Sequence, residues 1–386
     1  MRLAASLSAL TLVSACTAVE TASAPAPTSA FEALQAYYDT IPTSSLPRAP
    51  DGPALPGADD VVTTILVGSC NDEEKPSPAL ATIAGLEADL FLMVGDNVYG
   101  DRDGRAYTNN DADLNELKES FSDLAADPGF QAVRAATPMM VAWDDHDYGA
   151  NDAGREFPFK GLAERMHETF WHLDDEDVGA WPGTYYARSF GPDGQRVQVI
   201  MLDTRYFRSP LTPTDEWGAK GKERYMPAVP GSEQDLLGAE QWTWLENQLQ
   251  EPADLRLVVS SIQVLTSDGH GWEHWNNLPH ERQHLFDLVD DTDANGVVFV
   301  SGDRHASFLY RSTDSVSYPV HEITASSINA SFFDETEEID SAQIGSGYSL
   351  TNFGAININW DSRQVDLSIH SETGEMVRRT RFAIPD

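Results

Sequence analysis

The stretch PMMVAWDDHDYG, residues 138–149, runs from an apolar segment into a turn rich in ionisable groups. Asp144, Asp145, His146 and Asp147 follow one another there without a break. Carboxylates crowded at the end of a buried strand repel one another unless positive charge lies among them or water solvates them. The stretch therefore requires a cation, a basic partner or full exposure to solvent, and the other strand ends must decide between these.

Three further apolar runs end in side chains that can bind metal ions: Cys70 after the first, Asp96 and Tyr99 after the second, Asp303 and His305 after the third. Taken singly, an aspartate after a strand is commonly a helix cap or a turn former. In an α/β sheet, however, the carboxyl ends of the strands lie along one edge, where such side chains converge. The pattern therefore predicts one composite site.

The mixed donor set of this site predicts two kinds of cation. Thiolate, phenolate and imidazole suit a high-charge ion such as ferric iron, whereas carboxylates suit calcium, magnesium or manganese. An aspartate shared by two ions about 3.5 to 4 Å apart is the usual arrangement for in-line displacement at phosphorus. The alternative for Cys70 is a buried and inert thiol.

The elements that must position these groups alternate between apolar runs and helical patterns. The apolar, strand-like runs lie in residues 61–70, 89–101, 137–147, 197–205, 255–263 and 296–305. Helical patterns lie between some of them, in residues 77–88, 160–172 and 239–250. Strands that are buried on both faces and alternate with helices indicate an α/β layered architecture. The PDG turn at 192–194 and the alternating segments after residue 352 predict additional antiparallel strands in the same domain.

The N-terminal segment has the pattern of an export signal. MRLAASLSALTLVSAC combines an early arginine, a short apolar stretch and small residues before Cys16. LVSAC resembles a bacterial lipobox, in which Cys16 would carry the lipid; an ordinary secretory signal is the alternative. We expect a lipoprotein-type signal over residues 1–16, a tether and lead-in over 17–60, and one domain over 61–386. The protein would then be periplasmic or anchored at the outer membrane of a bacterium, with Cys70 left without a disulfide partner.

The charge balance excludes one class of partner. The 25 basic and 62 acidic residues give 25 − 62 = −37. Such a charge repels polyanions, so we expect no nucleic-acid polymer as a partner. The composition, 41% hydrophobic with 10% aromatic residues, is sufficient for a sizeable core.

The short motifs GSC, GDNVY, WDDHD, LDTR and SGDRH occur in this order. Together they resemble the PhoD-like alkaline phosphatases and phosphodiesterases, a branch of the calcineurin-like metallophosphoesterases, over nearly the whole chain after residue 60. The resemblance implies a four-layer α-β-β-α sandwich of mixed sheets. It also implies a phosphoric ester hydrolase that releases phosphate from organic esters by in-line attack of a metal-activated hydroxide. The alternatives are a phospholipase D-like phosphodiesterase of phospholipid or polymer diesters and, from another class, an acidic calcium-binding surface lipoprotein without catalysis.

The resemblance also implies roles for individual residues. Fe3+ and Ca2+ would be the ions, and their ligands by position would be Cys70, Asp96, Tyr99, Asp145, Asp303 and His305, with Asp96 shared. His146 would protonate the leaving oxygen or, alternatively, orient Asp145. Arg205 and Arg304 would stabilise charge on the phosphoryl oxygens, or else form ion pairs with neighbouring aspartates. The partners would be small phosphate esters or phospholipid headgroups, and the membrane through the lipid anchor.

We expect several other polar residues to act indirectly or to have structural roles. Asp144 and Asp147 are expected to orient neighbours or to cap the segment that follows. Gln263 stands where the wider superfamily has a histidine ligand, so the second ion would be held more loosely or through water. His167 lies on a helical segment, five residues before His172, and we expect both histidines to be structural.

Overall fold

The computed structural model describes residues 29–102, 111–174, 177–216, 224–266, 271–332 and 340–385. The predicted signal over residues 1–16 and the first part of the tether lie outside these residues. Within them, none of the helices combines the length and the apolar character that crossing a membrane requires.

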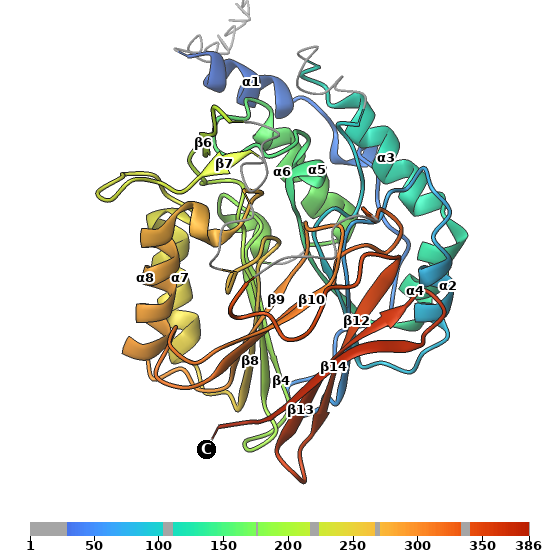
Figure 1. Ribbon diagram of the computed structural model, residues 1–386. Helices are drawn as coiled ribbons and strands as arrows, with labels where there is room; N and C mark the ends of the chain where they lie inside the picture. The colour runs from blue at the N-terminus through green and yellow to red at the C-terminus, as the bar shows by residue number, and fades with distance from the viewer. Residues whose placement is uncertain are drawn as a thin grey trace, which may run out of the picture.

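Two six-stranded sheets form the centre of the molecule (Figure 1). The first has the order β14-β13-β12-β1-β2-β3 and consists of β1 (Thr64–Gly68), β2 (Leu90–Val94), β3 (Met139–Ala142), β12 (Asn352–Asn359), β13 (Gln364–Ser371) and β14 (Met376–Ala383). Strands β1, β2 and β3 are parallel, and β12, β13 and β14 extend the sheet in antiparallel fashion. The antiparallel strands predicted after residue 352 therefore belong to this sheet.

The second sheet has the order β10-β11-β9-β8-β5-β4. Its strands are β4 (Tyr186–Phe190), β5 (Val197–Met201), β8 (Leu255–Val259), β9 (Val297–Ser301), β10 (Phe308–Ser312) and β11 (Val320–Thr324). Strands β5, β8, β9 and β11 are parallel, whereas β4 and β10 pair as antiparallel edges. The PDG turn joins β4 to β5, as the sequence predicts. A separate two-stranded ribbon pairs β6 (Thr212–Pro213) with β7 (Tyr225–Met226).

Helices cover the outer faces of the two sheets (Figure 1). One side carries α2 (Pro78–Ala84), α3 (Asn115–Ala126) and α4 (Pro128–Ala136), and the other side carries α7 (Gly238–Gln250) and α8 (Pro279–Asp291). The remaining helical segments are α1 (Ala30–Tyr38), α5 (Asp145–Tyr148), α6 (Lys160–Trp171), η1 (Thr43–Ser45), η2 (Val178–Ala180) and η3 (Trp275–Asn277). The lead-in after residue 29 packs on α6, where Arg165 donates hydrogen bonds to the carbonyls of Tyr38 and Ile41.

Strand β9 shows why the sequence of this fold contains continuous apolar runs. Val298 and Val300 belong to the core between the sheets, whereas Val297 and Phe299 belong to the cluster that packs under α7 and α8. Successive side chains of a strand point to opposite faces, so a strand covered on both faces is apolar at every position. The predicted four-layer α/β sandwich is confirmed.

Candidate metal centre

The carboxyl ends of strands from both sheets meet at one edge of the sandwich. The Asn71 amide donates to the Asp96 carbonyl at 2.8 Å, which joins the segments that follow β1 and β2. Gly95, at φ +97°, allows the closest approach: a Cβ atom there would lie 2.6 Å from Cβ of Asp144. Only glycine accommodates both this backbone conformation and this contact. The ends of β1, β2 and β3 are thereby held within reach of one another.

The first group of donors combines soft and hard ligands. Donor atoms of Cys70, Asp96 and His305 all lie within 4.8 Å of one another. Sγ of Cys70 is 3.4 Å from Oδ2 of Asp96, and the Tyr99 hydroxyl donates to the same oxygen at 3.3 Å. The Ser326 hydroxyl is 3.1 Å from the Cys70 sulfur and accepts a hydrogen bond from the His305 amide at 2.7 Å. Thiol, phenol, imidazole and carboxylate in one place suit a high-charge transition-metal ion.

The second group consists of carboxylates. Donor atoms of Asp144, Asp145 and Asp303 lie within 4.8 Å of one another, and those of Asp96 and Asp145 are equally close. Asp96 therefore lies between the soft group and the carboxylate group. Oδ1 of Asp144 accepts a hydrogen bond from the Ser261 hydroxyl at 2.7 Å, but Oδ2 is buried without a partner among the described residues. Asp144 thus has an oxygen available to a cation as well as its expected orienting contacts.

The electrostatics of the site favour bound cations. Burial raises the pKa values of Cys70 and Asp303 well above their usual ranges, and neighbouring acids raise them further. Burial likewise raises the pKa of Asp96, whose Oδ1 has no hydrogen-bond partner in the described part of the chain. A cation offsets the repulsion between these groups and gives the orphaned oxygens a partner. The donor set therefore fits metal ions.

Several candidate ligands adopt the left-handed backbone conformation. Their φ angles are 55° at Cys70, 48° at Asp96, 63° at Asp303 and 53° at His305. Such residues cost about 1 to 3 kcal/mol each and persist only where the surrounding structure holds them. The four residues share this conformation although they follow three different strands, and no pattern in the sequence predicts it.

His146 lies at the accessible rim of the site. Its Nδ1 is 2.5 Å from Oδ1 of Asp101, and its ring centroid is 4.2 Å from that of Tyr99. Burial alone would lower the pKa of His146, but the carboxylates of Asp145 and Asp101 raise it well above its usual value. The side chain keeps 16% exposure. This shift favours the protonated imidazole, which is the form that can give up a proton.

Two carboxyl groups of α5 lie in opposite environments. Asp147 accepts hydrogen bonds from the amides of Asn97 at 2.8 Å and Asp144 at 2.9 Å, and burial raises its pKa to about 8. Burial would also raise the pKa of Asp145, but the charges of His146 and Arg205 lower it below the usual range. Asp145 therefore carries a charge suited to a metal ion, whereas Asp147 has the capping contacts expected from the sequence.

Arg205 is fully buried between two carboxylates. Its Nε donates to Oδ1 of Asp144 at 2.5 Å, and its Nη1 is 2.6 Å from Oε2 of Glu273. Arg208 lies on the other side of Glu273, with Nη2 2.9 Å from Oε1. These contacts correspond to the ion-pair alternative for Arg205. Arg304 lines the cavity beside the donor groups.

This cavity has a volume of about 90 Å³. It is lined by Asp145, His146, Asn151, Asp152, Arg224, Trp272, Glu273, Asp303, Arg304, His305 and Phe332. The strand-end pattern does not predict Asp152 and Glu273, whose carboxylates lie within 4.8 Å of a donor oxygen of Asp145. Neither residue directly follows a strand, so the strand-end pattern gave no signal for them.

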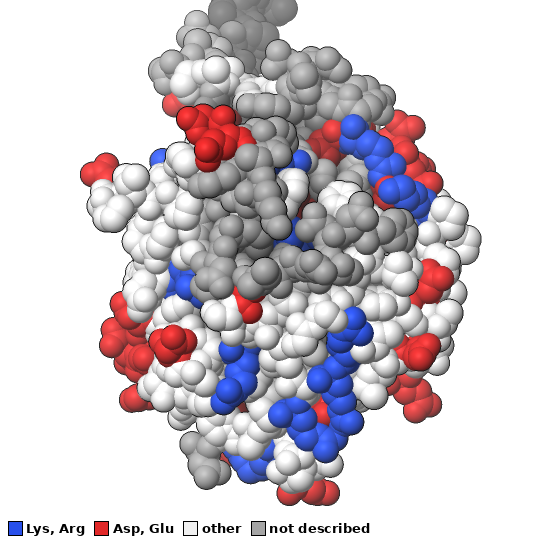
Figure 2. Space-filling model, viewed as in Figure 1, with Lys and Arg blue, Asp and Glu red and all other residues white. Residues whose placement is uncertain are grey.

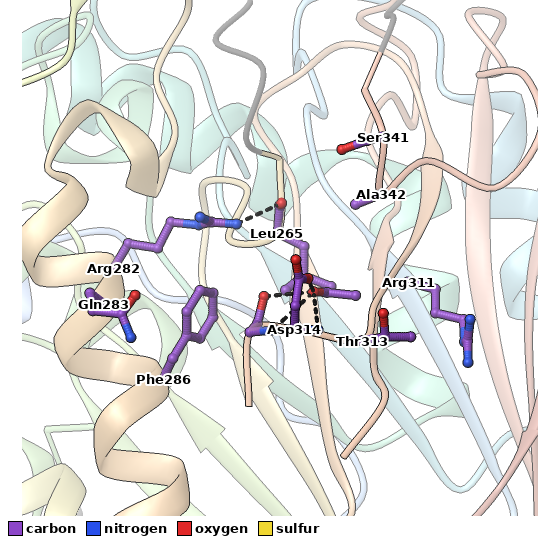
Figure 3. Close-up of a pocket in the computed structure, with 11 residues that line it drawn as sticks. Leu265, Arg282, Gln283, Phe286, Arg311, Thr313, Asp314, Ser341 and Ala342 are labelled. Carbon is purple, nitrogen blue, oxygen red and sulfur yellow. Dashed lines mark hydrogen bonds between the residues drawn. The ribbon is translucent and has the colours of Figure 1, made fainter. Parts of the chain in front are cut away.

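A separate cavity of about 350 Å³ lies beside α8 (Figure 3). Arg282 crosses one wall and donates to the carbonyls of Val264 and Leu265, while Phe286 packs below its guanidinium. None of the predicted catalytic or metal-binding residues lines this cavity. The metal centre is therefore a different site.

Comparison with known proteins assigns the family. A family model described as PhoD-like phosphatase matches residues 65–369. The chain belongs to the PhoD-like phosphatase family. Alkaline phosphatase D of Bacillus subtilis (strain 168) is 25% identical over 289 residues, which are 66% of this chain and 47% of that protein. The match thus spans about half the length of this curated relative.

A solved structure of PhoD shares the fold. Its TM-score is 0.62 at 19% sequence identity, and the match covers 85% of this chain and 73% of that chain. The PhoD-like resemblance of the five short motifs is confirmed, and the predicted enzyme class, a phosphoric ester hydrolase, is the class of this family. Within this PhoD-like chain, Gln263 donates to the Tyr310 hydroxyl at 2.8 Å and to Oγ1 of Thr324 at 3.0 Å. Gln263 is therefore engaged within the second sheet.

Proposed function

We propose that this chain is an exported, metal-dependent phosphoesterase that hydrolyses organic phosphate esters and releases phosphate. The observation that supports it most strongly is the convergence of Cys70, Asp96 and Asp145 from separate strand ends beside one small cavity. Binding pockets for whole small molecules usually measure about 300 Å³ or more. A cavity of about 90 Å³ suits a phosphoryl group, with the alcohol part of the ester outside.

The residues present fit the ions that the family resemblance implies. Fe3+ would be held by the soft group and Ca2+ by the carboxylates, with the ligands Cys70, Tyr99 and His305 for the first, Asp145 and Asp303 for the second, and Asp96 between them. When bound, such ions supply Lewis acidity and make water nucleophilic near neutral pH. Asp144, with its orphaned buried oxygen, extends the carboxylate side.

Two side chains would act directly on the substrate. Nδ1 of His146 is engaged by Asp101, which leaves Nε2 as the nitrogen that can pass a proton to the leaving oxygen. Arg304 would bind the phosphoryl oxygens through its guanidinium. Arg205 would act indirectly, because its contacts hold Asp144 and Glu273 in place.

A phosphodiesterase is the second candidate, and the mouth of the cavity favours it. Phe332 is 53% exposed there and stacks on the His305 ring with a centroid distance of 4.1 Å. Trp272 also lines the cavity. Aromatic rings beside a phosphoryl site offer contact area to an organic group on the ester, including the second alcohol of a diester.

The proposal is tested by hydrolysis of 4-nitrophenyl phosphate and bis(4-nitrophenyl) phosphate. Wild type should turn over at least one of them, and the ratio of the two rates separates monoesterase from diesterase. Asp96→Asn should lose at least about 100-fold in rate, because the shared ligand is gone. Asp193→Asn, at an exposed turn, is the matched control. Absence of turnover with any added metal would support the calcium-binding lipoprotein instead.

Cys16 is the residue that would anchor the exported protein. We propose that its lipid holds the domain at a bacterial membrane, because LVSAC resembles a lipobox and a small-residue, Pro-containing segment follows it. Cys16→Ala should move the protein from the membrane fraction to the soluble fraction. A wild-type protein that is already soluble in the same fractionation would contradict the anchor.

A further inference from the structure

A groove of about 870 Å³ lies at the end of the sandwich opposite the metal centre. It is formed by β10, the start of β11, the turn between β12 and β13, and the end of β14. Its lining residues include the cationic groups Arg311, Arg363 and Arg381 and the ring of His321. Because β11 runs parallel to β9, the start of β11 lies at the amino ends of the parallel strands. The metal centre lies at their carboxyl ends.

The arginines of the groove differ in how far other residues engage them. Arg381 makes a two-point contact with Asp366, with both distances 2.8 Å. Arg363 donates to the Pro385 carbonyl at 3.0 Å, and its Nη1 lies 3.6 Å from Oδ1 of Asp254. The Arg311 guanidinium forms no hydrogen bond or ion pair with any described residue. Arg311 lines both this groove and the cavity beside α8, and in Figure 3 its guanidinium points away from Arg282.

A buried histidine gives the second, independent observation. His321 is 4% exposed and lines the groove, and its Nδ1 is buried without a hydrogen-bond partner among the described residues. Its ring stacks on Phe382 with a centroid distance of 3.9 Å and an interplanar angle of 7°. Buried polar atoms are normally paired with protein, water or ligand. The ring that carries this unpartnered nitrogen lines the groove.

The charged side chains around the groove differ from those of the chain as a whole. Figure 2 shows Lys and Arg side chains gathered over β13 and β14, although the whole chain carries a net charge of −37. Among the residues that line the groove, three are arginines, Arg311, Arg363 and Arg381, and one is a carboxylate, Asp361. Asp254 and Asp366 pair with Arg363 and Arg381 from beside the groove.

We propose that this groove binds the phosphate group of an organic phosphate. Guanidinium groups match the oxyanion in geometry and charge, so Arg311 and Arg363 would contact the phosphate oxygens together with His321. Tyr318 and Phe382 would pack against the apolar part of the ligand. A soluble phosphate ester and a phospholipid headgroup share this chemistry. The groove would bind such a group whether or not the metal centre is catalytic.

Binding of phenylphosphonate, which phosphoesterases cannot hydrolyse, tests the proposal by calorimetry on the metal-loaded protein. Wild type should show a site that survives Asp96→Asn, because this variant affects only the metal centre. Arg311→Ala should weaken that site about tenfold, the loss expected for one charge-assisted contact. His321→Phe, which keeps the ring stack, should weaken it as well. Arg48→Ala removes one exposed cation elsewhere and should leave it unchanged.

Flotation with vesicles of phosphatidylcholine, with and without phosphatidylglycerol, distinguishes the source of the phosphate. If wild type binds the anionic vesicles and Arg311→Ala does not, the groove binds lipid headgroups. Phenylphosphonate binding without vesicle binding assigns it to soluble esters. If wild type, Arg311→Ala and Arg48→Ala behave alike in both assays, the groove is not a phosphate site.

Discussion

The sulfur of Cys70 lies 3.4 Å from Oδ2 of Asp96, although the two residues follow different strands. Both are buried, at 0% and 1% exposure, and burial raises both of their pKa values. Two acidic groups in such a place compete for protons with any cation that binds them. Metal binding at this centre should therefore release protons and weaken as the pH falls.

Substituting Cys70 tests the soft side of the centre. Cys70→Ser replaces a thiolate donor with a harder and less acidic hydroxyl. We expect the affinity for the softer ion to fall at least about tenfold, or ~1.4 kcal/mol, and hydrolysis to fall with it. Metal titration measures the first effect and the unfolding midpoint controls for misfolding. Unchanged metal content would show that Cys70 is an inert buried thiol.

Arg205 should contribute to stability through its buried ion pairs. Arg205→Ala leaves Asp144 buried without its counter-charge and Glu273 paired with Arg208 alone. Breaking a buried ion pair in this way typically costs about 3 to 5 kcal/mol. The free energy of unfolding from denaturant titration measures this. Arg155→Ala, which removes a half-exposed pair with Asp235, should change it by no more than about 1 kcal/mol. Lost activity at full stability would instead favour direct stabilisation of the phosphoryl group.

The contribution of Phe332 to KM should depend on the organic group of the ester. Phe332→Ala removes an exposed ring at the mouth of the cavity, so KM for 4-nitrophenyl esters should rise about 3- to 10-fold. KM for methyl phosphate esters, which cannot reach the ring, should stay nearly constant. Val229→Ala, at a position 72% exposed, is the control for loss of surface apolar area. Equal changes for both ester types would argue against contact with the organic group.

His167 should make the protein less stable in acid. It is fully buried against Trp143, both ring nitrogens lack partners among the described residues, and burial lowers its pKa to about 3. Below about pH 6.5 His167 binds a proton in the unfolded chain but not in the folded protein. The free energy of unfolding therefore falls as the pH drops from 6.5 toward 3. The loss at pH 5 relative to pH 7.5 should be about 2 kcal/mol.

The measurement compares unfolding free energies at pH 5 and pH 7.5. His167→Phe should lose less stability than wild type over this interval, and His280→Gln, on an exposed side chain of α8, should match wild type. Parallel curves for wild type and His167→Phe would show that His167 is not the acid-sensitive group.

Much of the fold could be predicted because its strands are buried on both faces. The run before Asp303 is apolar at every position, which indicates a central strand, and β9 covers Val297–Ser301. Since β9 belongs to a layered α/β fold, the groups after it had to lie at the edge that carries the site. Cys70, Asp96 and Asp145 also follow strands of such a fold, and their donor atoms lie close together at this edge.

The remaining parts of the site depend on tertiary contacts. Glu273 and Asp101 come from loops, and only the folded chain brings Glu273 to Arg205 and Asp101 to His146. The sequence also could not choose between the two interpretations of Arg205, because an arginine after a strand is compatible with both. Its burial between two carboxylates is a property of packing between the sheets.

The central claim is that Cys70, Asp96 and their neighbours hold metal ions that the reaction requires. Elemental analysis of wild-type protein purified without added metals, with 4-nitrophenyl ester hydrolysis measured on the same sample, tests it most directly. We predict iron together with calcium, and loss of both metal and activity after chelation. Zinc as the sole metal, or full activity in metal-free protein, would contradict the account.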